Sequence, residues 1–124
     1  MDKFVYDGLS IGMSLSQVYQ ANYISCEADT AMGSSWTSCA SDKNFFPPFL
    51  GYNIDDVEVE LANGKTVVAI NLITSANVDP KELKQKANGT LTTKVKLNLV
   101  SIKNHEDSLM VFKGKIAIMD NQRN

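Results

Sequence analysis

The clearest alternation of hydrophobic and polar positions lies in residues 57–74. From residue 57 to 61, valine and leucine alternate with glutamate, which is the period of a half-buried strand. Asn63-Gly64 then predicts a tight hairpin turn, because these residues readily adopt the positive φ that such turns need. With a two-residue loop, we expect Val59 to lie opposite Val68 on the same face of the sheet.

The return strand, residues 66–74, is apolar on both of its faces. Val67, Ala69 and Ile73 stand on the face that the first strand fills with glutamate. A strand that is apolar on both sides is typical of the middle of a sheet, with something covering its second side. Val67 and Ile73 are therefore candidate contacts for a partner.

Two short helices are predicted from their start signals. Ser14 and Gln17 have the spacing of a capping box, in which each side chain bonds the backbone amide of the other residue. Asp79, Pro80 and Glu82 repeat this logic, with proline at the first helical position. Each helix precedes a predicted hairpin, so the order helix and then hairpin occurs twice.

The remaining strands are predicted from weaker alternation. Residues 35–40 favour a strand, residues 95–102 favour another with a break in its alternation, and residues 109–119 favour a return strand with a bulge at Gly114. The chain is thus expected to be a single α+β domain, residues 1–124, with a polar tail at 120–124. Its sheet should be mostly antiparallel, with four to five strands and two short helices packed on one face.

Composition narrows the classes of partner. The formal net charge of −2 gives no electrostatic reason to expect nucleic acid. No apolar run reaches the ~18 residues that a membrane-spanning helix needs. The first residues, MDKFVYDG, lack the apolar core of a signal peptide, so the chain is either cytoplasmic or has lost a leader.

Cys26 and Cys39 are the only cysteines, thirteen residues apart in a stretch rich in small and polar residues. A disulfide between them would stabilise this stretch and would indicate an oxidising compartment such as a periplasm. The alternative is a pair of buried, reduced thiols. Two cysteines are too few for a zinc site without histidine ligands, and the one histidine, His105, lies far along the chain.

No constellation of catalytic or metal-binding residues is found. His105 stands alone in a predicted turn, which favours a solvated residue over a metal ligand or a general base. Glu58 and Glu60 share one strand face like paired catalytic carboxylates, but a solvated or interface rim is the simpler interpretation. We therefore expect a protein without a cofactor or metal that is not an enzyme.

An aromatic stretch gives the remaining candidates for partner binding. Pro47 and Pro48 exclude a central strand here, so the nearby rings decorate an irregular segment. The rings either form an exposed docking surface or close over one edge of the core. The candidates are Phe45, Phe46, Phe49 and Tyr52.

Part of the chain resembles a known family. Gly12-Met13-Ser14, Gln17-Val18, Trp36 and Asn63-Gly64-Lys65 resemble the motifs of small periplasmic domains of the SmpA/OmlA (BamE-like) type, to which the β-lactamase-inhibitor-protein fold is related. The resemblance covers roughly residues 8–74. It implies helices on one face of an antiparallel sheet, no catalysis, and protein–protein binding in the cell envelope.

These observations lead to a functional expectation. We expect a non-catalytic protein-binding module of the bacterial cell envelope, periplasmic or secreted. The alternative is an enzyme inhibitor or immunity protein that blocks an exported hydrolase or toxin. The partner is another protein of unknown identity, and a homodimer is a further alternative.

Overall fold

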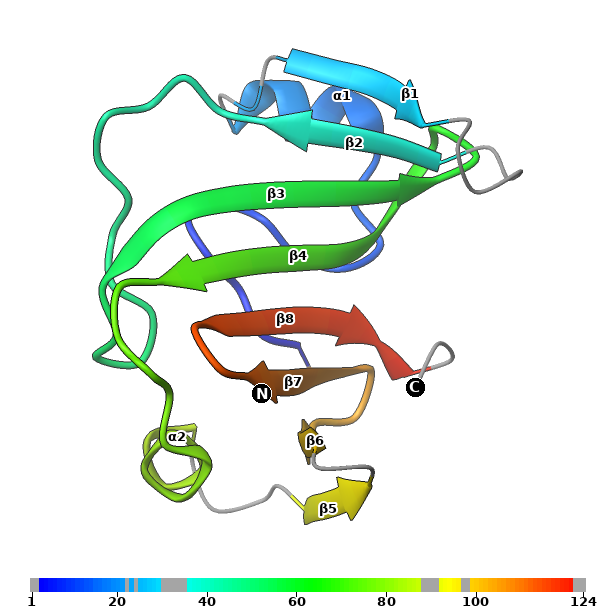
Figure 1. Cartoon of the computed structure of the whole chain (residues 1–124). Coiled ribbons are helices and arrows are strands. Elements are labelled where there is room, and N and C mark those ends of the chain that lie inside the picture. The colour runs from blue at the N-terminus through cyan, green and yellow to red at the C-terminus, as the bar shows by residue number, and fades with distance from the viewer. Residues whose placement is uncertain are drawn as a thin grey trace.

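The computed structural model describes residues 3–21, 23, 25–29, 36–87, 92–96 and 99–121. In this part of the chain, eight antiparallel strands form one sheet in the order β1-β2-β3-β4-β8-β7-β6-β5, with two short helices (Figure 1). The helices are α1 (Leu15–Gln20) and α2 (Pro80–Lys86). The strands are β1 (Ser25–Asp29), β2 (Trp36–Ala40), β3 (Ile54–Ala62), β4 (Thr66–Thr74), β5 (Thr92–Lys96), β6 (Leu99–Lys103), β7 (Asp107–Phe112) and β8 (Lys115–Asp120).

The expected α+β fold, with four to five strands and two helices packed on one face, is wrong. The protein is mostly β, and its helices have only six and seven residues. Each helix contributes one fully buried side chain, Val18 from α1 and Leu83 from α2. Helices of this length do not form a layer over an eight-stranded sheet, and Figure 1 shows them far apart, with α1 behind β1 and β2 and α2 beyond the end of β4.

The extra strands come from turns that the alternation did not reveal. The expected strand at 95–102 is two strands, β5 and β6, and the expected strand at 109–119 is β7 and β8. Gly114, expected to mark a bulge, has a φ of 75° and lies in the turn between β7 and β8. Strand β1 adds an eighth strand that pairs with β2.

The sheet order is symmetric about its centre. One helix and four consecutive strands form each half, α1 with β1–β4 and α2 with β5–β8. The two halves meet where β4 pairs antiparallel with β8, and Ile70 lies opposite Ile118 at this seam. The repeated order of helix and then hairpin in the sequence therefore corresponds to these two halves, although each half contains four strands and not two.

The central hairpin forms, but with a different register. Asn63 and Gly64 both have positive φ, and the Lys65 amide donates to the Ala62 carbonyl, as expected of the turn. Val59 nevertheless lies opposite Ile70, two residues beyond the expected partner Val68. The shift accumulates in two single-residue steps, after the turn and at a bulge that includes Val68. A shift of one residue would turn every side chain to the opposite face, but a shift of two returns each to its expected face. The apolar residues of β3 and β4 therefore still meet on one face.

The predicted helix starts are confirmed, except that Glu82 does not close a capping box at α2: the Asp79 amide donates to the Tyr52 hydroxyl, and Glu82 pairs with Lys86. Ser14 and Gln17 make both hydrogen bonds of the capping box. At α2, the Asp79 side chain accepts a hydrogen bond from the Lys81 amide, and proline stands in the first turn.

The core lies between the sheet and an irregular covering. We call residues 3–11 the N-terminal segment; its buried side chains are Phe4, Tyr6, Leu9 and Ile11. Figure 1 shows this segment crossing behind β8, β4 and β3. It is held at both ends of its path: the Phe4 amide donates to Asp107 at 2.7 Å, and the Gly12 amide donates to the Val67 carbonyl at 2.9 Å.

Candidate protein-binding surface

The register divides the sheet into two faces. The inner face carries the core, with Val59 opposite Ile70 and Ile70 opposite Ile118. Alternate residues lie on the other face, which we call the outer face. Described side chains at its positions are Glu27, Ser38, Ala40, Asp56, Glu58, Glu60, Ala69, Asn71, Ile73, Ser101, Lys103, Ser108, Met110, Phe112, Lys115, Ala117 and Met119.

The centre of the outer face is made of small and apolar side chains. Ala69 and Ala117 are each only 2% exposed, although both belong to this face. Ala69 pairs with Glu60 on one side and Met119 on the other, and Ala117 pairs with Met110. Longer neighbours at distances typical of cross-strand pairs therefore shield the two methyl groups from water.

The acidic side of the outer face has a perturbed carboxyl group. Burial raises the pKa of Glu60, and the charge of Glu58 and a hydrogen bond with it raise the pKa further. Lys115 and Asn71 act on Glu60 in the opposite direction. The two glutamates lie on one face, as their spacing predicted, and they interact with each other.

Charge is divided across this face. On β1 to β3, its described charged residues are all acidic: Glu27, Asp56, Glu58 and Glu60. On β6 and β8 they are lysines, Lys103 and Lys115. Among the described residues, no ion pair within 4.0 Å joins the two groups.

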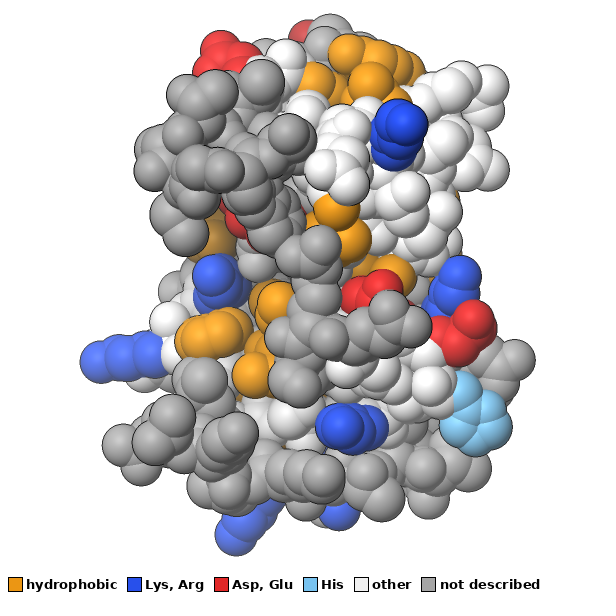
Figure 2. All heavy atoms as spheres, turned by 90° about the vertical axis from the view of Figure 1, so that its right-hand side faces the viewer, with side chains coloured by type: hydrophobic (Ala, Val, Ile, Leu, Met, Phe, Trp, Pro, Cys, Tyr) orange, Lys and Arg blue, Asp and Glu red, His pale blue; other side chains and the backbone are white. Residues whose placement is uncertain are grey.

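The surface seen from the side agrees with this mixture of types. Figure 2 views the molecule from the right-hand side of Figure 1 and shows small groups of hydrophobic side chains at the top and at mid-height, with lysine and acidic side chains beside them. Lys115 holds its ammonium nitrogen 4.8 Å from the centre of the Phe112 ring, so its aliphatic stem follows apolar surface. An apolar centre with charged margins is the usual arrangement of a protein–protein interface.

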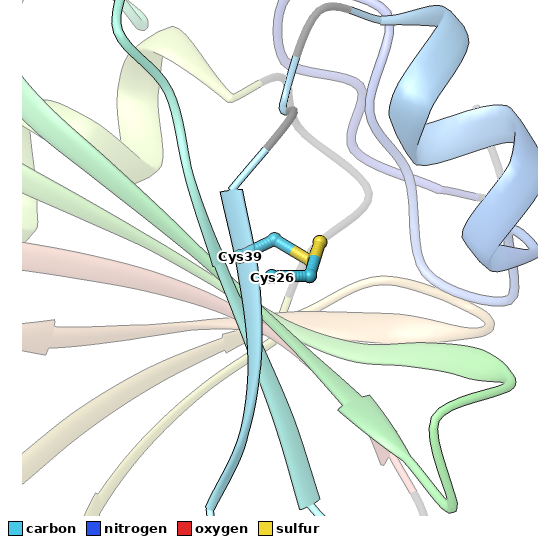
Figure 3. The surroundings of a disulfide bond; sticks show 2 residues. All are labelled: Cys26 and Cys39. Atoms are coloured by element: carbon cyan, nitrogen blue, oxygen red, sulfur yellow. A yellow bond between two sulfur atoms is a disulfide. The ribbon is translucent and has the colours of Figure 1, made fainter.

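The disulfide proposed for Cys26 and Cys39 is present. The two residues lie directly opposite each other on β1 and β2, with their Cα atoms 4.0 Å apart. Figure 3 shows both side chains projecting to the side of these strands on which α1 lies, and Cys39 belongs to the core. The bond fastens the hairpin at one edge of the sheet, and a disulfide is typical of oxidising compartments.

The aromatic stretch is divided between core and surface. Phe46 and Phe49 are buried, and Phe49 makes edge-on contacts with Phe4 and Tyr6 at ring-centre distances of 6.5 and 6.0 Å. Phe45 is 75% exposed. Thus two of the rings close over the core and one is left at the surface.

The other candidate contacts also differ in exposure. Tyr52 is half-buried, and its hydroxyl accepts a hydrogen bond from the Asp79 amide at 2.9 Å. Val67 is fully buried on the inner face, whereas Ile73 is 38% exposed on the outer face opposite Lys115. Ile73 is therefore the one candidate that belongs to the outer face.

Sequence reasoning missed most of the outer face because of one misplaced turn. Residues 110, 112, 116 and 118 have the same parity, which suggests a single face in one long strand. The turn at Lys113-Gly114 reverses the chain, so Met110 pairs with Ala117 and not with the isoleucines. A lysine-glycine pair between two apolar runs was the signal for this turn.

The described residues show no alternative chemical centre. His105 is exposed in the turn before β7, and its amide donates to its neighbour Asn104. The described part of the chain contains no group of three or more histidine, cysteine, aspartate or glutamate residues placed to hold a metal ion. It also contains no helix with the length and hydropathy required to cross a bilayer.

Comparison with protein families, curated proteins and solved structures finds no match for this chain.

Proposed function

We propose that this chain is a non-catalytic protein-binding module of the bacterial cell envelope and that it contacts its partner through the outer face. The observation that carries the proposal is the composition of this face. Its accessible apolar side chains are Ile73, which is 38% exposed, and the half-buried Met110 and Met119, and they lie between Glu58 on β3 and Lys103 on β6. Apolar contact and charge complementarity are therefore available on the same surface.

The proposed location rests on two observations. The Cys26–Cys39 disulfide favours an oxidising compartment, and the periplasm is the bacterial compartment of this kind. The resemblance of residues 8–74 to BamE-like domains points to the same place. In that family the corresponding motif belongs to domains that bind other proteins.

Site-specific photo-crosslinking tests the proposed surface. A benzophenone amino acid at position 73 places the reactive group on the outer face, where Ile73 is already partly exposed. We expect a protein adduct from position 73 in living cells. The matched control is position 5, because Val5 is 61% exposed but belongs to the N-terminal segment on the opposite side of the sheet.

A second substitution shows whether the adduct depends on the outer face. Met119→Asp adds a charge next to Ala69, and it should abolish the adduct from position 73. Equal labelling from positions 5 and 73, or labelling from neither, would contradict the proposal. An adduct with an exported hydrolase or toxin would identify the chain as an inhibitor of that enzyme.

A further inference from the structure

We propose that the partner of the outer face is a second copy of this chain, in a two-fold dimer that places the acidic half of each sheet against the basic half of the other. This inference rests on the proposed use of the outer face for protein binding. It names the partner that the charge distribution fits best.

The first argument is that the face is self-complementary. Acidic residues such as Glu58 and Glu60 stand on β3, and Lys103 and Lys115 stand on β6 and β8, on opposite sides of the Ala69–Ala117 centre. The formal charge of the whole chain is only −2, so the separation is not a consequence of a strong overall charge. A surface with opposite charges at its two ends is complementary to its own rotated copy.

The second argument is the symmetry of the strand order. A two-fold axis parallel to the strands, placed over the seam of β4 and β8, lays each half of one sheet over the other half of its copy. Strand β3 then faces the copy's β7, which lies between the two lysine-bearing strands β8 and β6. Such an axis preserves the rows across the sheet, so Glu60 comes into the row of the copy's Lys103 and Asp56 into the row of the copy's Lys115, while Glu58 lies over Met110. Each contact occurs twice.

The alternative two-fold axis is disfavoured by charge. An axis running across the strands would lay β3 over the copy's β3, so that Glu58 and Glu60 would face the same residues. Like charges opposite one another cost several kcal/mol in an interface. The charge pattern therefore selects one orientation.

The centre of the face suits close approach of two sheets. Ala69 and Ala117 at the seam are already shielded by their longer neighbours, so a second sheet ~10 Å away would contact those neighbours and not the two methyl groups. Met110 and Met119 stand beside them, and flexible methionine side chains fill the irregular space between two such surfaces.

The size of the face and its electrostatics agree with a dimer. Eight strands ~4.8 Å apart and five residues or more in length cover roughly 600 Å² before side-chain relief is counted, against about 800 Å² per partner in a standard interface. The raised pKa of Glu60 shows that burial and Glu58 outweigh the positive charge that the chain itself supplies there.

Reciprocal charge reversal tests this arrangement by sedimentation equilibrium on the purified chain. We expect the protein at 50 mM salt to have twice the mass of one chain. The double variant Glu58→Lys/Glu60→Lys should raise the dimer dissociation constant by about 100-fold, and Lys103→Glu/Lys115→Glu should do the same. An equimolar mixture of the two variants should restore the dimer, which also shows that both have folded.

A matched control changes charge elsewhere. Lys81→Glu/Lys84→Glu alters two exposed lysines on α2 by the same amount, and it should leave the dimer unchanged. A monomeric wild-type protein at millimolar concentration, a dimer that survives both reversals, or a mixture that stays monomeric would overturn the dimer. If the chain is monomeric while position 73 still labels a different protein, the proposed function stands and only the identity of the partner is wrong.

Discussion

At the scale of single residues, Asp107 is the side chain with the least ordinary environment. It is fully buried, one carboxylate oxygen accepts from the Phe4 amide, and the other has no hydrogen-bond partner among the described residues. Burial raises its pKa to about 6, while the Phe4 amide and the charge of Lys3 counteract part of this effect. A buried carboxylate with one unsatisfied oxygen is costly when charged, so the folded protein favours its protonated form.

This environment predicts an unusual pH dependence of stability. Because the pKa of folded Asp107 lies above that of an unfolded aspartate, its contribution to stability is full below pH ~4 and is lost as the pH rises through about 6. Asp107→Asn keeps an acceptor for the Phe4 amide and does not titrate. Between pH 7.5 and 4.5, the free energy of unfolding of the wild type should therefore rise relative to that of the variant by roughly 2 kcal/mol.

Urea unfolding at a series of pH values measures this difference. Glu106→Gln is the control for a neighbouring exposed charge: because the charge of Glu106 contributes to raising the pKa of Asp107, this variant should keep the pH dependence but with its midpoint at a lower pH. Parallel pH profiles for the wild type and Asp107→Asn would show that Asp107 is not the titrating group.

At the scale of elements, the glycine-containing turns of the β3–β4 and β7–β8 hairpins differ in their surroundings. Gly64, between β3 and β4, has a φ of 63°, and a Cβ atom there would lie 3.2 Å from the Thr37 hydroxyl oxygen. Gly114, between β7 and β8, has a φ of 75° and nothing within 4 Å of the same position. Both turns need a left-handed residue, but only the first also needs space.

Alanine at each glycine separates these two requirements. Gly114→Ala should lower the free energy of unfolding by about 1 kcal/mol, the cost of a left-handed conformation for a residue with Cβ. Gly64→Ala should cost more, by up to about 1 kcal/mol, because the new methyl group also crowds Thr37. Thermal unfolding of the two variants gives the comparison, and equal losses would mean that Thr37 moves aside freely.

At the scale of the whole molecule, local features could be predicted from the sequence, whereas the way in which they combine into one sheet could not. The capping box of Ser14, the Asn63-Gly64 turn and the disulfide pair were all predictable, because each depends on residues close in the chain or on a rare residue type. The number of strands and their order could not be predicted in this way. They depend on the Lys113-Gly114 turn and on the pairing of β4 with β8, whose residues are more than forty positions apart. The outer face went unrecognised for the same reason, since pairing places Met110 beside Ala117.

The seam predicts that the two halves unfold together. Ile70 and Ile118 pair at the seam, and the N-terminal segment contacts both halves, so neither half has a complete core alone. Leu109→Ala, in the second half, should lower stability by about 2–5 kcal/mol. The fluorescence of Trp36, on β2 in the first half, should report the same lowered urea midpoint as far-UV circular dichroism.

The control for this experiment is Lys113→Ala, an exposed position in the second half that should move neither signal. The halves would be independent if Leu109→Ala left the urea midpoint of Trp36 fluorescence at its wild-type value while circular dichroism showed a transition at lower urea.

The bond from Phe4 to Asp107 spans 103 positions along the chain, and it has a consequence during synthesis. A ribosome therefore makes the N-terminal segment 103 residues before the carboxylate that anchors it. Until then Phe4, Tyr6 and Leu9 have no finished sheet to cover. The nascent chain therefore exposes these apolar side chains until Asp107 has been made, and exposed apolar segments of this kind are what chaperones bind.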